Sequence, residues 1–500
     1  MYKRIISLSI VVLFLFVCIG GRVGYISLSK NYVVDFGKNS YSFVIDNKQP
    51  TVYYRSGIKA TNNCYRFVAV VKPNPKCIGE LNKLFSNSKC NEIIEELKKG
   101  KPVLVYLDSC PMVQLNAIKI YKALSSNNNL YQIISKSSNG LLNHIASPIG
   151  KYSISFSVDA NGRMLDGDEG TTEKINYDSN EGYQISIDEQ IQNIAVKASS
   201  NMKSGCVVVM DVNDSSILAC VNKPFDDYNI KAFGQYCVGS VFKIVVACCA
   251  LENNCSPIYD CKGTVKVGDT QFRCQNGNVH YVQGLKQALA NSCNCYFVNL
   301  ALTLGRDKLL ATCNKLGFDS YTRLFDDWDI LNAQLPTKND LASQGELSLF
   351  GFGQGKLTVT PMQICSVLCT IANGGTFNQP RLVLKGVNDK GEMSQIIYPQ
   401  GKKVLSKSTC DNLIRYMRYV VTNGTASSVM YNDRFSAGKT ATAQTGQYIR
   451  NTERLNTWFA GVYPYNNPKY AIVVMTENGS SGAGDCCPIF STIVENIDNM

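Results

Sequence analysis

GSVFK, residues Gly239 to Lys243, stands at the head of a long apolar stretch and decides how the rest of the chain is interpreted. On a helix, residues three apart share a face, so Lys243 would lie within reach of the Ser240 hydroxyl. A serine becomes a good nucleophile when a base lies beside it, and apolar neighbours would lower the pKa of the lysine enough for it to accept a proton. The spacing therefore predicts acyl-transfer chemistry.

The Ser-x-x-Lys spacing is common, and taken alone it would fit a solvated helix face. It also occurs elsewhere in this chain, for example at Ser27 and Lys30, Ser56 and Lys59, Ser86 and Lys89, and Ser200 and Lys203. The only two histidines, His144 and His280, lie far from Ser240 in the sequence, and a lysine base needs neither. Further motifs must distinguish Ser240 from the other serines.

Two such motifs follow downstream. Ser292 to Asn294 (SCN) places a hydroxyl and an amide two residues apart, able to relay a proton and to hold a substrate carbonyl, although alone it would fit the polar cap of the next helix. Lys439 to Thr442 (KTAT) follows Gly438 in a strand-like run. There a lysine and a threonine could bind a carboxylate, and an edge strand could pair with a peptide, although alone it would fit an ordinary strand.

The order of apolar runs predicts the architecture of the region that carries the motifs. Strand-like runs occur near both ends of this region, at 205–211, 217–222, 435–443, 457–463 and 470–477. Helical segments between them include 240–251, 284–304 and 360–373. We expect an α+β fold in which one antiparallel sheet carries a helical subdomain.

The three motifs, in this order, resemble those of the serine transpeptidases and β-lactamases that recognise penicillin. The resemblance covers about residues 180 to 495 and points to class B penicillin-binding proteins. The stretches that carry it are 182–192 (GYQISIDEQIQ), 223–229, 236–243 (YCVGSVFK), 287–297 (QALANSCNCYF), 352–363 (FGQGKLTVTPMQ), 372–375, 422–426, 438–444 (GKTATAQ), 458–461 and 468–479.

The resemblance implies a peptidoglycan D,D-transpeptidase on the penicillin-binding fold, with a central five-stranded antiparallel sheet flanked by helices. Ser240 would attack the penultimate D-alanine of a stem peptide, and Lys243 would take its proton. Ser292, helped by Lys439, would pass a proton to the leaving amine, and Asn294 would hold the acyl side chain. A β-lactam would acylate the same serine, and neither a cofactor nor a metal is implied.

The third motif would bind the substrate through Thr440, Ala441 and Thr442, with the oxyanion between the backbone N–H groups of Ser240 and Thr442. This family usually has glycine where the chain has Ala441. The extra methyl group is either tolerated or crowds the site and weakens β-lactam acylation. The family also usually has proline where the chain has Val238, which should loosen the turn only slightly.

The N-terminal region is expected to attach the protein to a membrane. Lys3 and Arg4 precede an uncharged run, 5–21, which a weaker run extends to residue 28. This pattern predicts a single-pass anchor at 1–28 with a cytoplasmic N-terminus and the rest of the chain outside the cell. A cleaved signal peptide and a lipidated Cys18 are the alternatives.

The remaining sequence divides into a small pedestal domain at 29–178 and a transpeptidase domain at 179–500. The pedestal lacks the Arg-Gly-x-Ile-x-Asp-Arg stretch that the family carries after its anchor, and it shows no glycosyltransferase pattern. A membrane glycosyltransferase is therefore the expected partner, alongside the stem peptides. A β-lactam-hydrolysing enzyme or sensor, and a catalytically silent scaffold, remain alternatives. The motifs do not discriminate elongation, division and sporulation.

Charge and cysteine content bear on whether the chain binds nucleic acid or zinc and on the role of its cysteines. The formal charge of +11 comes from scattered lysines and arginines, which fits an anionic cell surface and does not indicate nucleic acid. The 21 cysteines are odd in number and include no C-x-x-C, and the close pairs lack partners at zinc-site spacing. We expect most of them to be small buried apolar residues.

Overall fold

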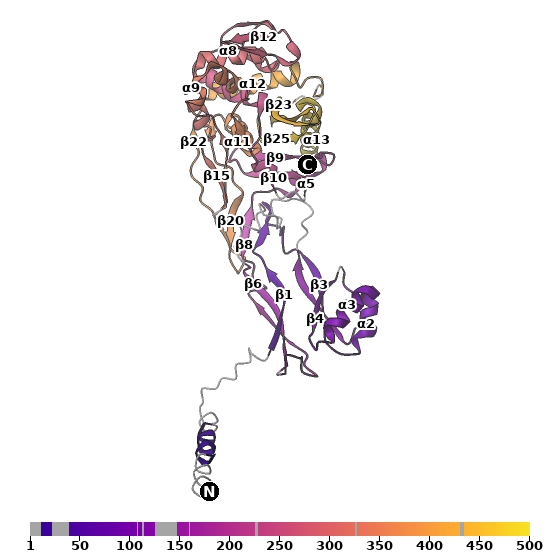
Figure 1. Cartoon of the computed structure of the whole chain (residues 1–500). Helices are drawn as coiled ribbons and strands as arrows, with labels where there is room; N and C mark the ends of the chain where they lie inside the picture. Colours follow the sequence, from indigo (N-terminus) through magenta and orange to yellow (C-terminus); the bar gives the residue numbers. More distant parts are fainter. Residues whose placement is uncertain are drawn as a thin grey trace, which may run out of the picture. The chain divides into compact units, whose positions relative to one another are not determined.

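A five-stranded antiparallel sheet forms the centre of the region that carries the motifs, in the order β10-β9-β25-β24-β23 (Figure 1). Its strands are β9 (Gly205–Asp211), β10 (Ile217–Lys223), β23 (Ala437–Ile449), β24 (Thr452–Tyr463) and β25 (Tyr470–Glu477). The computed structural model describes residues 12–22, 40–107, 109–112, 115–125, 148–159, 161–225, 229–325, 328–430 and 435–500. The expected antiparallel sheet of five strands is confirmed.

The inner strands β9 and β25 are almost entirely apolar because helices cover both faces of the sheet. Val208 and Val473 pair across β9 and β25 and belong to the larger core with α11 (Pro361–Ala372). Their neighbours Val207 and Val474 belong to a second core on the other face, with α5 (Glu189–Ala198) and α13 (Cys487–Asp498). Successive side chains of a strand point to opposite faces, so each strand supplies both cores.

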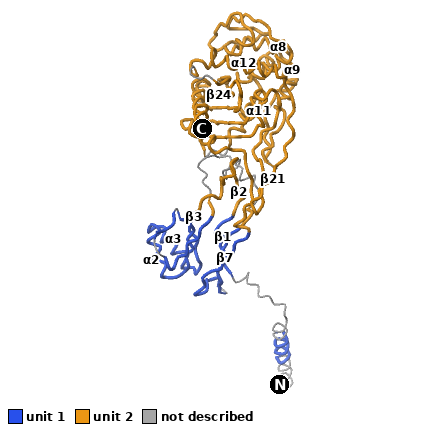
Figure 2. The backbone as a smooth tube through the Cα atoms, turned by 180° about the vertical axis from the view of Figure 1, so that it is seen from behind, with its two compact units in different colours: residues 1–47, 66–123, 151–175 blue, residues 48–65, 124–150, 176–500 orange. Residues whose placement is uncertain are grey.

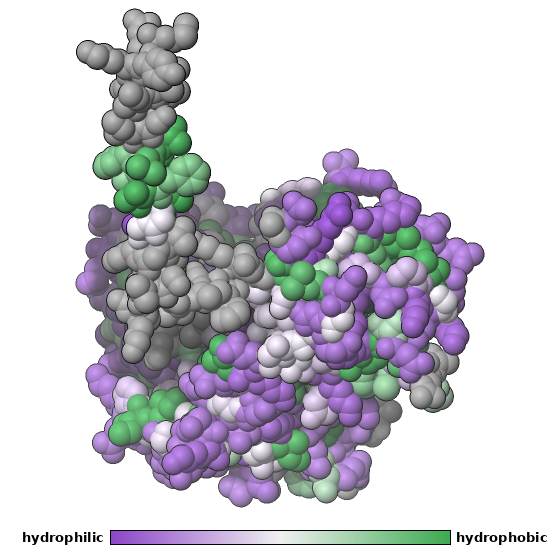
Figure 3. Space-filling view, turned by 90° about the horizontal axis from the view of Figure 1, so that it is seen from below, coloured by the Kyte–Doolittle hydropathy of each residue, from purple (hydrophilic) through white to green (hydrophobic). Residues whose placement is uncertain are grey.

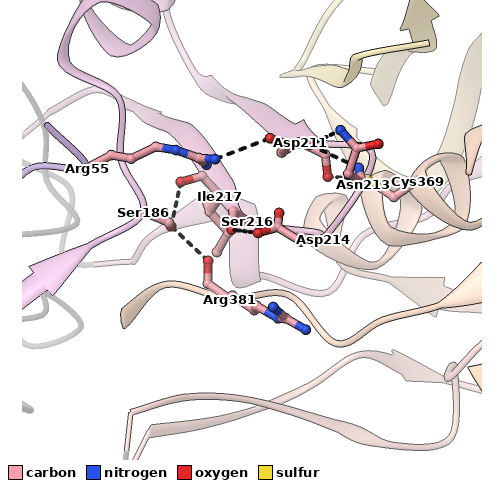
Figure 4. Close-up of polar contacts among 9 residues, drawn as sticks. All are labelled: Arg55, Ser186, Asp211, Asn213, Asp214, Ser216, Ile217, Cys369 and Arg381. Atoms are coloured by element: carbon pink, nitrogen blue, oxygen red, sulfur yellow. Dashed lines mark hydrogen bonds and ion pairs between the residues drawn. The ribbon is translucent and has the colours of Figure 1, made fainter. Parts of the chain in front are cut away.

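The turn between β9 and β10 is fixed by polar contacts (Figure 4). Asp211 accepts from the backbone N–H of Asn213 at 2.9 Å, and Asp214 accepts from the Ser216 hydroxyl at 2.9 Å. The buried Ser186 hydroxyl, from the segment before α5, reaches the carbonyl of Ile217 at 2.7 Å. These contacts hold the turn that joins β9 to β10.

The helical region lies between β10 and β23 in the sequence. It consists of η3 (Lys231–Phe233), η4 (Gly239–Phe242), α6 (Lys243–Glu252), η5 (Gln275–Gly277), α7 (Leu285–Ala290), α8 (Asn294–Leu304), α9 (Arg306–Lys315), η6 (Asp340–Ala342), α10 (Gln344–Gly351), α11 and α12 (Lys407–Asn423). Small two-stranded sheets accompany it: β11 (Tyr259–Cys261) with β14 (Tyr281–Gln283), β12 (Thr264–Val267) with β13 (Thr270–Arg273), β15 (Tyr321–Phe325) with β16 (Trp328–Leu331), β17 (Ala333–Gln334) with β18 (Thr358–Val359), and β19 (Thr376–Phe377) with β22 (Lys402–Lys403). Helix α6 is buried on nearly all sides, which explains its apolar composition.

Two expected helices begin or break differently in the structure. The residues Gly239–Phe242 form a tight 3-10 turn, and the α-helix begins only at Lys243. The helix expected at 284–304 is divided into α7 and α8, because Ser292 adopts a left-handed backbone conformation with φ of 52°. Both departures fall on the motif residues, where regular helix would point the side chains elsewhere.

The chain divides into two compact units, drawn in separate colours in Figure 2. The smaller comprises 1–47, 66–123 and 151–175, and the larger comprises 48–65, 124–150 and 176–500. Residues 48–65 belong to the larger unit because β2 (Thr51–Tyr53) pairs with β8 (Gly182–Ile185) in a sheet with β20 (Val383–Val387) and β21 (Met393–Gln395). The division therefore interleaves in sequence, whereas the predicted domains, 29–178 and 179–500, are continuous.

The smaller unit contains two three-stranded sheets, β1-β6-β7 and β4-β3-β5. Its elements are β1 (Ser40–Lys48), β3 (Cys64–Val71), α2 (Cys77–Leu84), α3 (Asn87–Leu97), β4 (Val103–Leu107), β5 (Ile118–Ser125), β6 (Gly150–Ser157) and β7 (Thr171–Ile175). Helix α2 buries Cys77 and Leu81 against the same core as α3.

Residues 12–22 are helical, and their apolar side chains, including Leu13 and Phe16, are exposed (Figure 3). Within the described ranges, no helix has the length and apolar character needed to span a bilayer. Residues 1–11 and 23–28 of the expected anchor lie outside the described residues.

Candidate active site

The turn that carries Ser240 is held by close backbone contacts that require glycine. Gly239 has φ of 55°, and a Cβ there would lie 2.9 Å from the Ala443 Cβ on β23. The Gly239 N–H donates to the Gly353 carbonyl at 3.0 Å, and the Trp458 indole donates to the Cys237 carbonyl at 3.1 Å. The nucleophile turn is thus fixed between the edge of the sheet and the loop after α10.

Gly353 offers a direct test of this support. Its φ is 82°, and a Cβ there would lie 2.0 Å from the Gly239 carbonyl oxygen. Gly353→Ala should lower the free energy of unfolding by about 1–3 kcal/mol for the collision, in addition to about 1 kcal/mol for the left-handed backbone. It should also slow acylation by a fluorescent penicillin, because the turn that carries Ser240 must shift.

Gly374→Ala is the matched control, since its φ is 84° but a Cβ would meet nothing within 4 Å. Urea unfolding should show only the backbone cost of about 1 kcal/mol, and the acylation rate should be unchanged. Equal acylation rates in the two variants would contradict the supporting role of Gly353.

The Lys243 amine lies at the point where the first two motifs meet. Its Nζ lies 3.0 Å from Ser240 Oγ, 2.7 Å from the Ser292 carbonyl oxygen, 3.2 Å from Ser292 Oγ and 2.7 Å from Asn294 Oδ1. The side chain is completely buried. The two serine hydroxyls and the Asn294 amide oxygen therefore converge on the amine nitrogen of Lys243, although Ser240 and Asn294 are 54 positions apart.

These contacts define which partner takes each hydrogen of Lys243. The Ser292 carbonyl and Asn294 Oδ1 can only accept, so each receives one N–H, and the orientation of the Asn294 amide is fixed because its Nδ2 donates to the Arg273 carbonyl at 2.9 Å. When Lys243 is neutral, the lone pair of its nitrogen can accept a hydrogen bond from the hydroxyl of Ser240 or Ser292. Burial lowers the pKa of Lys243 to about 7, so the neutral form is accessible near neutral pH.

The second motif is positioned by the break between α7 and α8. Cys293 caps α8 by accepting from the Tyr296 N–H, and the left-handed Ser292 turns its carbonyl and its hydroxyl toward Lys243. A left-handed serine costs about 1–3 kcal/mol and persists where the surroundings impose it. Cys293 therefore caps the helix, and the side chains of Ser292 and Asn294 contact Lys243 instead.

The third motif lies on β23, the edge strand of the central sheet. Lys439 is fully buried, and among the described residues its Nζ donates to the Thr440 carbonyl at 2.8 Å and makes no hydrogen bond to Ser292. Burial lowers its pKa well below the usual value, and the charge of Lys243 lowers it further. The expected help of Lys439 to Ser292 thus has no direct contact in this structure.

The other residues of the third motif border the cleft. The Thr440 hydroxyl lies 2.6 Å from that of Thr425, and the Thr442 hydroxyl accepts from the Gly482 N–H at 3.4 Å. Ala441 is 3% exposed and packs into the larger core. Its methyl group is therefore mostly directed away from open solvent.

A cleft of about 760 Å³ joins the three motifs. It is lined by Ser240, Arg273, Cys274, Gln275, Ser292, Asn294, Thr425, Thr440, Ala441, Thr442, Gln444, Thr452, Glu453, Leu455, Ser481, Gly482 and Ala483. Lys243 and Lys439 are not among these residues and lie buried behind it. The cleft can admit a peptide beside the edge strand, with the Ser240 hydroxyl exposed to it.

Residues 205–495, more than half of the chain, match the family model described as the penicillin binding protein transpeptidase domain. The chain belongs to the penicillin-binding protein transpeptidase family. The family resemblance drawn from the motifs is confirmed.

Curated relatives of this family match over most of the chain. Stage V sporulation protein D of Bacillus subtilis (strain 168) is 27% identical over 359 residues, which cover 66% of this chain and 54% of that protein. Peptidoglycan D,D-transpeptidase MrdA of Haemophilus influenzae is 27% identical over 365 residues, covering 62% of this chain and 55% of that protein. The chain spans little more than half the length of these relatives.

Solved structures of penicillin-binding proteins share the fold. Penicillin-binding protein 2 of Helicobacter pylori, solved in complex with MreC, has a TM-score of 0.65 at 20% identity, covering 92% of this chain and 100% of that chain. Penicillin-binding protein A of M. tuberculosis, solved as a penicillin G acyl-enzyme complex, has a TM-score of 0.56 at 22% identity, covering 63% of this chain and 80% of that chain.

Several residues that border or support the cleft were not singled out from the sequence. Thr425 contacts the third motif, Gly353 supports the nucleophile turn and Trp458 ties that turn to β24. All three fall in stretches that resemble the family, so the resemblance was the signal that could have found them. Their contacts join residues distant in the sequence, which no local pattern predicts.

One group of side chains in the described part of the chain has the donors of a metal site. Cys261, Cys274, His280 and Cys293 place their sulfur and nitrogen atoms within 4.8 Å of one another, directly behind Ser292 and Asn294. The sequence offered no familiar zinc spacing here, because these residues are separated by 13, 6 and 13 positions.

Proposed function

We propose that this chain is a peptidoglycan D,D-transpeptidase that acts through an acyl-enzyme on Ser240. The observation that carries the proposal is the set of contacts of Lys243 Nζ, which joins Ser240 Oγ to the second motif from a fully buried position. Relatives named D,D-transpeptidases and the membership of the family add support.

The proposed acylation uses the geometry as follows. Ser240 Oγ attacks the penultimate D-alanine carbonyl of a stem peptide, and its proton moves to Lys243 Nζ across 3.0 Å. As the C–N bond breaks, Ser292 Oγ, 3.2 Å from the same amine, passes a proton to the departing D-alanine. Backbone N–H groups of Ser240 and Thr442 bind the oxyanion, a contribution typically worth about 3 kcal/mol of barrier.

The second half of the proposed reaction resolves the ester. The amine of a neighbouring stem peptide attacks the acyl carbonyl and gives up a proton, which Ser292 passes to Lys243. The bond to Ser240 Oγ breaks, and Lys243 returns that proton to the serine. Asn294 holds the acyl side chain, while the Thr440 hydroxyl, which borders the cleft, is available to a substrate carboxylate. A β-lactam forms the same ester by opening its ring.

Transpeptidation itself is tested with the purified full chain, a D-alanyl-D-alanine donor peptide and an amine acceptor. Mass spectrometry should find the donor joined to the acceptor with loss of one D-alanine, and preincubation with penicillin should abolish the product. Release of D-alanine without any joined product would replace the proposal by a carboxypeptidase. No product and no penicillin adduct would reject it.

The pKa of Lys243 predicts how acylation depends on pH. Only the neutral amine accepts the serine proton, and burial places its pKa at about 7. Acylation by penicillin should therefore accelerate as pH rises through about 7 and level off above it. Burial also lowers the pKa of Lys439, the other fully buried amine near the cleft, well below its usual value.

The acylation rate measured between about pH 5.5 and 9 checks this prediction. The unfolding transition, recorded over the same range, is the control for loss of native protein. A rate that does not change across the range would contradict Lys243 as the base.

Ala441→Gly separates the enzyme from a silent scaffold. Because the methyl group is 3% exposed and packs into the core, its removal should change the acylation rate by no more than a factor of about four, equivalent to about 0.8 kcal/mol for one buried methyl group. Stopped-flow labelling with a fluorescent penicillin measures the effect. A large gain in rate would indicate that Ala441 silences the wild-type protein.

Attachment to a membrane and a glycosyltransferase partner belong to the same proposal. The support is the uncharged run at 5–21 with Lys3 and Arg4 before it. Photo-cross-linking from positions in this run, carried out in cells, should capture a membrane glycosyltransferase. Recovery of the protein in the soluble fraction, with no cross-linked product, would reject this part.

A further inference from the structure

A compact cluster of three cysteines and one histidine lies beside the active site. Cys261 ends β11, Cys274 follows β13, His280 precedes β14, and Cys293 caps α8. Cys274 Sγ lies 3.7 Å from Cys261 Sγ and 3.7 Å from Cys293 Sγ, and Cys261 Sγ lies 3.5 Å from His280 Nδ1. Three of the four residues are almost fully buried.

These distances match the edges of a zinc tetrahedron. With zinc–sulfur bonds of about 2.3 Å and zinc–nitrogen bonds of about 2.0 Å, tetrahedral geometry places sulfurs about 3.8 Å apart and a sulfur about 3.5 Å from a nitrogen. A disulfide would need a separation of about 2.05 Å, so the sulfurs are not bonded to one another. We propose that Cys261, Cys274, His280 and Cys293 bind one zinc ion.

Hydrogen bonds to the sulfurs favour thiolates over packed thiols. The Gly263 N–H donates to Cys261 Sγ and the Tyr296 N–H donates to Cys293 Sγ, both at 3.4 Å. Ligand thiolates commonly receive such contacts from the surrounding backbone. Three thiolates and an imidazole prefer zinc to magnesium or calcium, whose ligands are oxygens.

Gly263, two positions after the proposed ligand Cys261, allows a close backbone contact beside the cluster. Its φ is 83°, and a Cβ would lie 2.4 Å from the Gly277 carbonyl oxygen. This close approach brings the segment after Cys261 against the segment after Cys274. Cys261 and Cys274 are thus brought together by a backbone contact that leaves no room for a side chain at position 263.

The zinc ion would hold the second motif of the active site in place. Cys293 lies between Ser292 and Asn294, and the Asn294 amide donates to the carbonyl of Arg273, the residue before Cys274. The β12–β13 hairpin packs against α8 (Figure 1). With four protein ligands the ion has no open position, so its role is structural and the cluster residues are positioning residues. The effect of the zinc ion on acylation rests on the proposed transpeptidase function, whereas the binding of zinc does not.

The test measures metal in the purified full chain and its variants. Elemental analysis should find about one zinc ion per chain, and exchange for cobalt should give the visible absorption of a tetrahedral thiolate site. Cys261→Ala, Cys274→Ala and His280→Ala should each lose most of the metal and the absorption. Cys295→Ala and Cys313→Ala are matched controls for loss of a buried cysteine and should keep both.

Cys295 makes the sharper control, because its sulfur lies 3.5 Å from Cys274 Sγ yet is not among the four converging atoms. Loss of the metal in Cys295→Ala, with retention in His280→Ala, would overturn the assigned ligand set. A wild-type chain that binds no zinc or cobalt after incubation with either ion would overturn the site, as would a Cys261–Cys274 disulfide in the native protein.

Penicillin labelling of the same samples separates the two proposals. The zinc-free variants should label about 10- to 100-fold more slowly than the controls. Bound zinc with no labelling would reject the proposed function and leave the site intact. A variant that loses zinc but is labelled at the control rate would reject only the effect of zinc on acylation.

Discussion

Ser240→Ala should abolish covalent labelling by penicillin, lowering the acylation rate by at least about 10⁴-fold. The Ser240 hydroxyl is the one that lies both in the lining of the cleft and 3.0 Å from the buried Lys243 amine. Loss of its oxygen removes the atom that forms the ester, while the turn remains fixed by Gly239 and Gly353. Intact mass spectrometry after incubation with penicillin measures the adduct.

Ser200→Ala is the matched control, because Ser200 and Lys203 share the Ser-x-x-Lys spacing but are both exposed. This variant should form the adduct at the wild-type rate. A penicillin adduct on Ser240→Ala that maps to another residue would show that the nucleophile is elsewhere.

Lys243→Met should reduce the acylation rate by about 10³-fold while the protein remains folded. Methionine keeps most of the buried volume of the side chain but has no amine to accept the serine proton. It also leaves the Ser292 carbonyl and Asn294 Oδ1 without their donor, at a cost of about 1–3 kcal/mol each. Burying an apolar group in place of an amine offsets part of that loss.

Urea unfolding and stopped-flow labelling together measure the two effects of Lys243→Met. Lys203→Met, at an exposed lysine of the same spacing, should change neither quantity. A Lys243→Met variant that is acylated at the wild-type rate would rule out Lys243 as the base and leave Lys439, the other lysine with no exposed surface among the described residues, as the candidate.

Much of the fold could be predicted from the sequence because its strands are short, apolar and rich in β-branched residues. β9 and β10, with Val207 and Val221 paired, lie where the pattern predicts them. The left-handed backbone at Gly239 and Ser292 could not be predicted, since it is imposed by tertiary contacts and not by local propensity. The interleaved units likewise depend on β2 pairing with β8 across a long separation.

The sequence by itself determined the chemical types and their order: a serine three positions before a lysine, then Ser292 and Asn294, then Lys439 and Thr440. Local spacing is sufficient there, because residues one turn apart meet whatever surrounds them. Only the tertiary structure decided that Asn294 reaches Lys243 and that Lys439 does not bond Ser292.

The tertiary structure also decided the cysteine cluster, whose spacing in the sequence resembles no zinc motif. Four side chains from two hairpins and a helix cap meet there because the hairpins fold onto α8. Contacts of this kind depend on how whole elements pack, and packing is set by the shape of the buried core as a whole and not by the distance between residues along the chain.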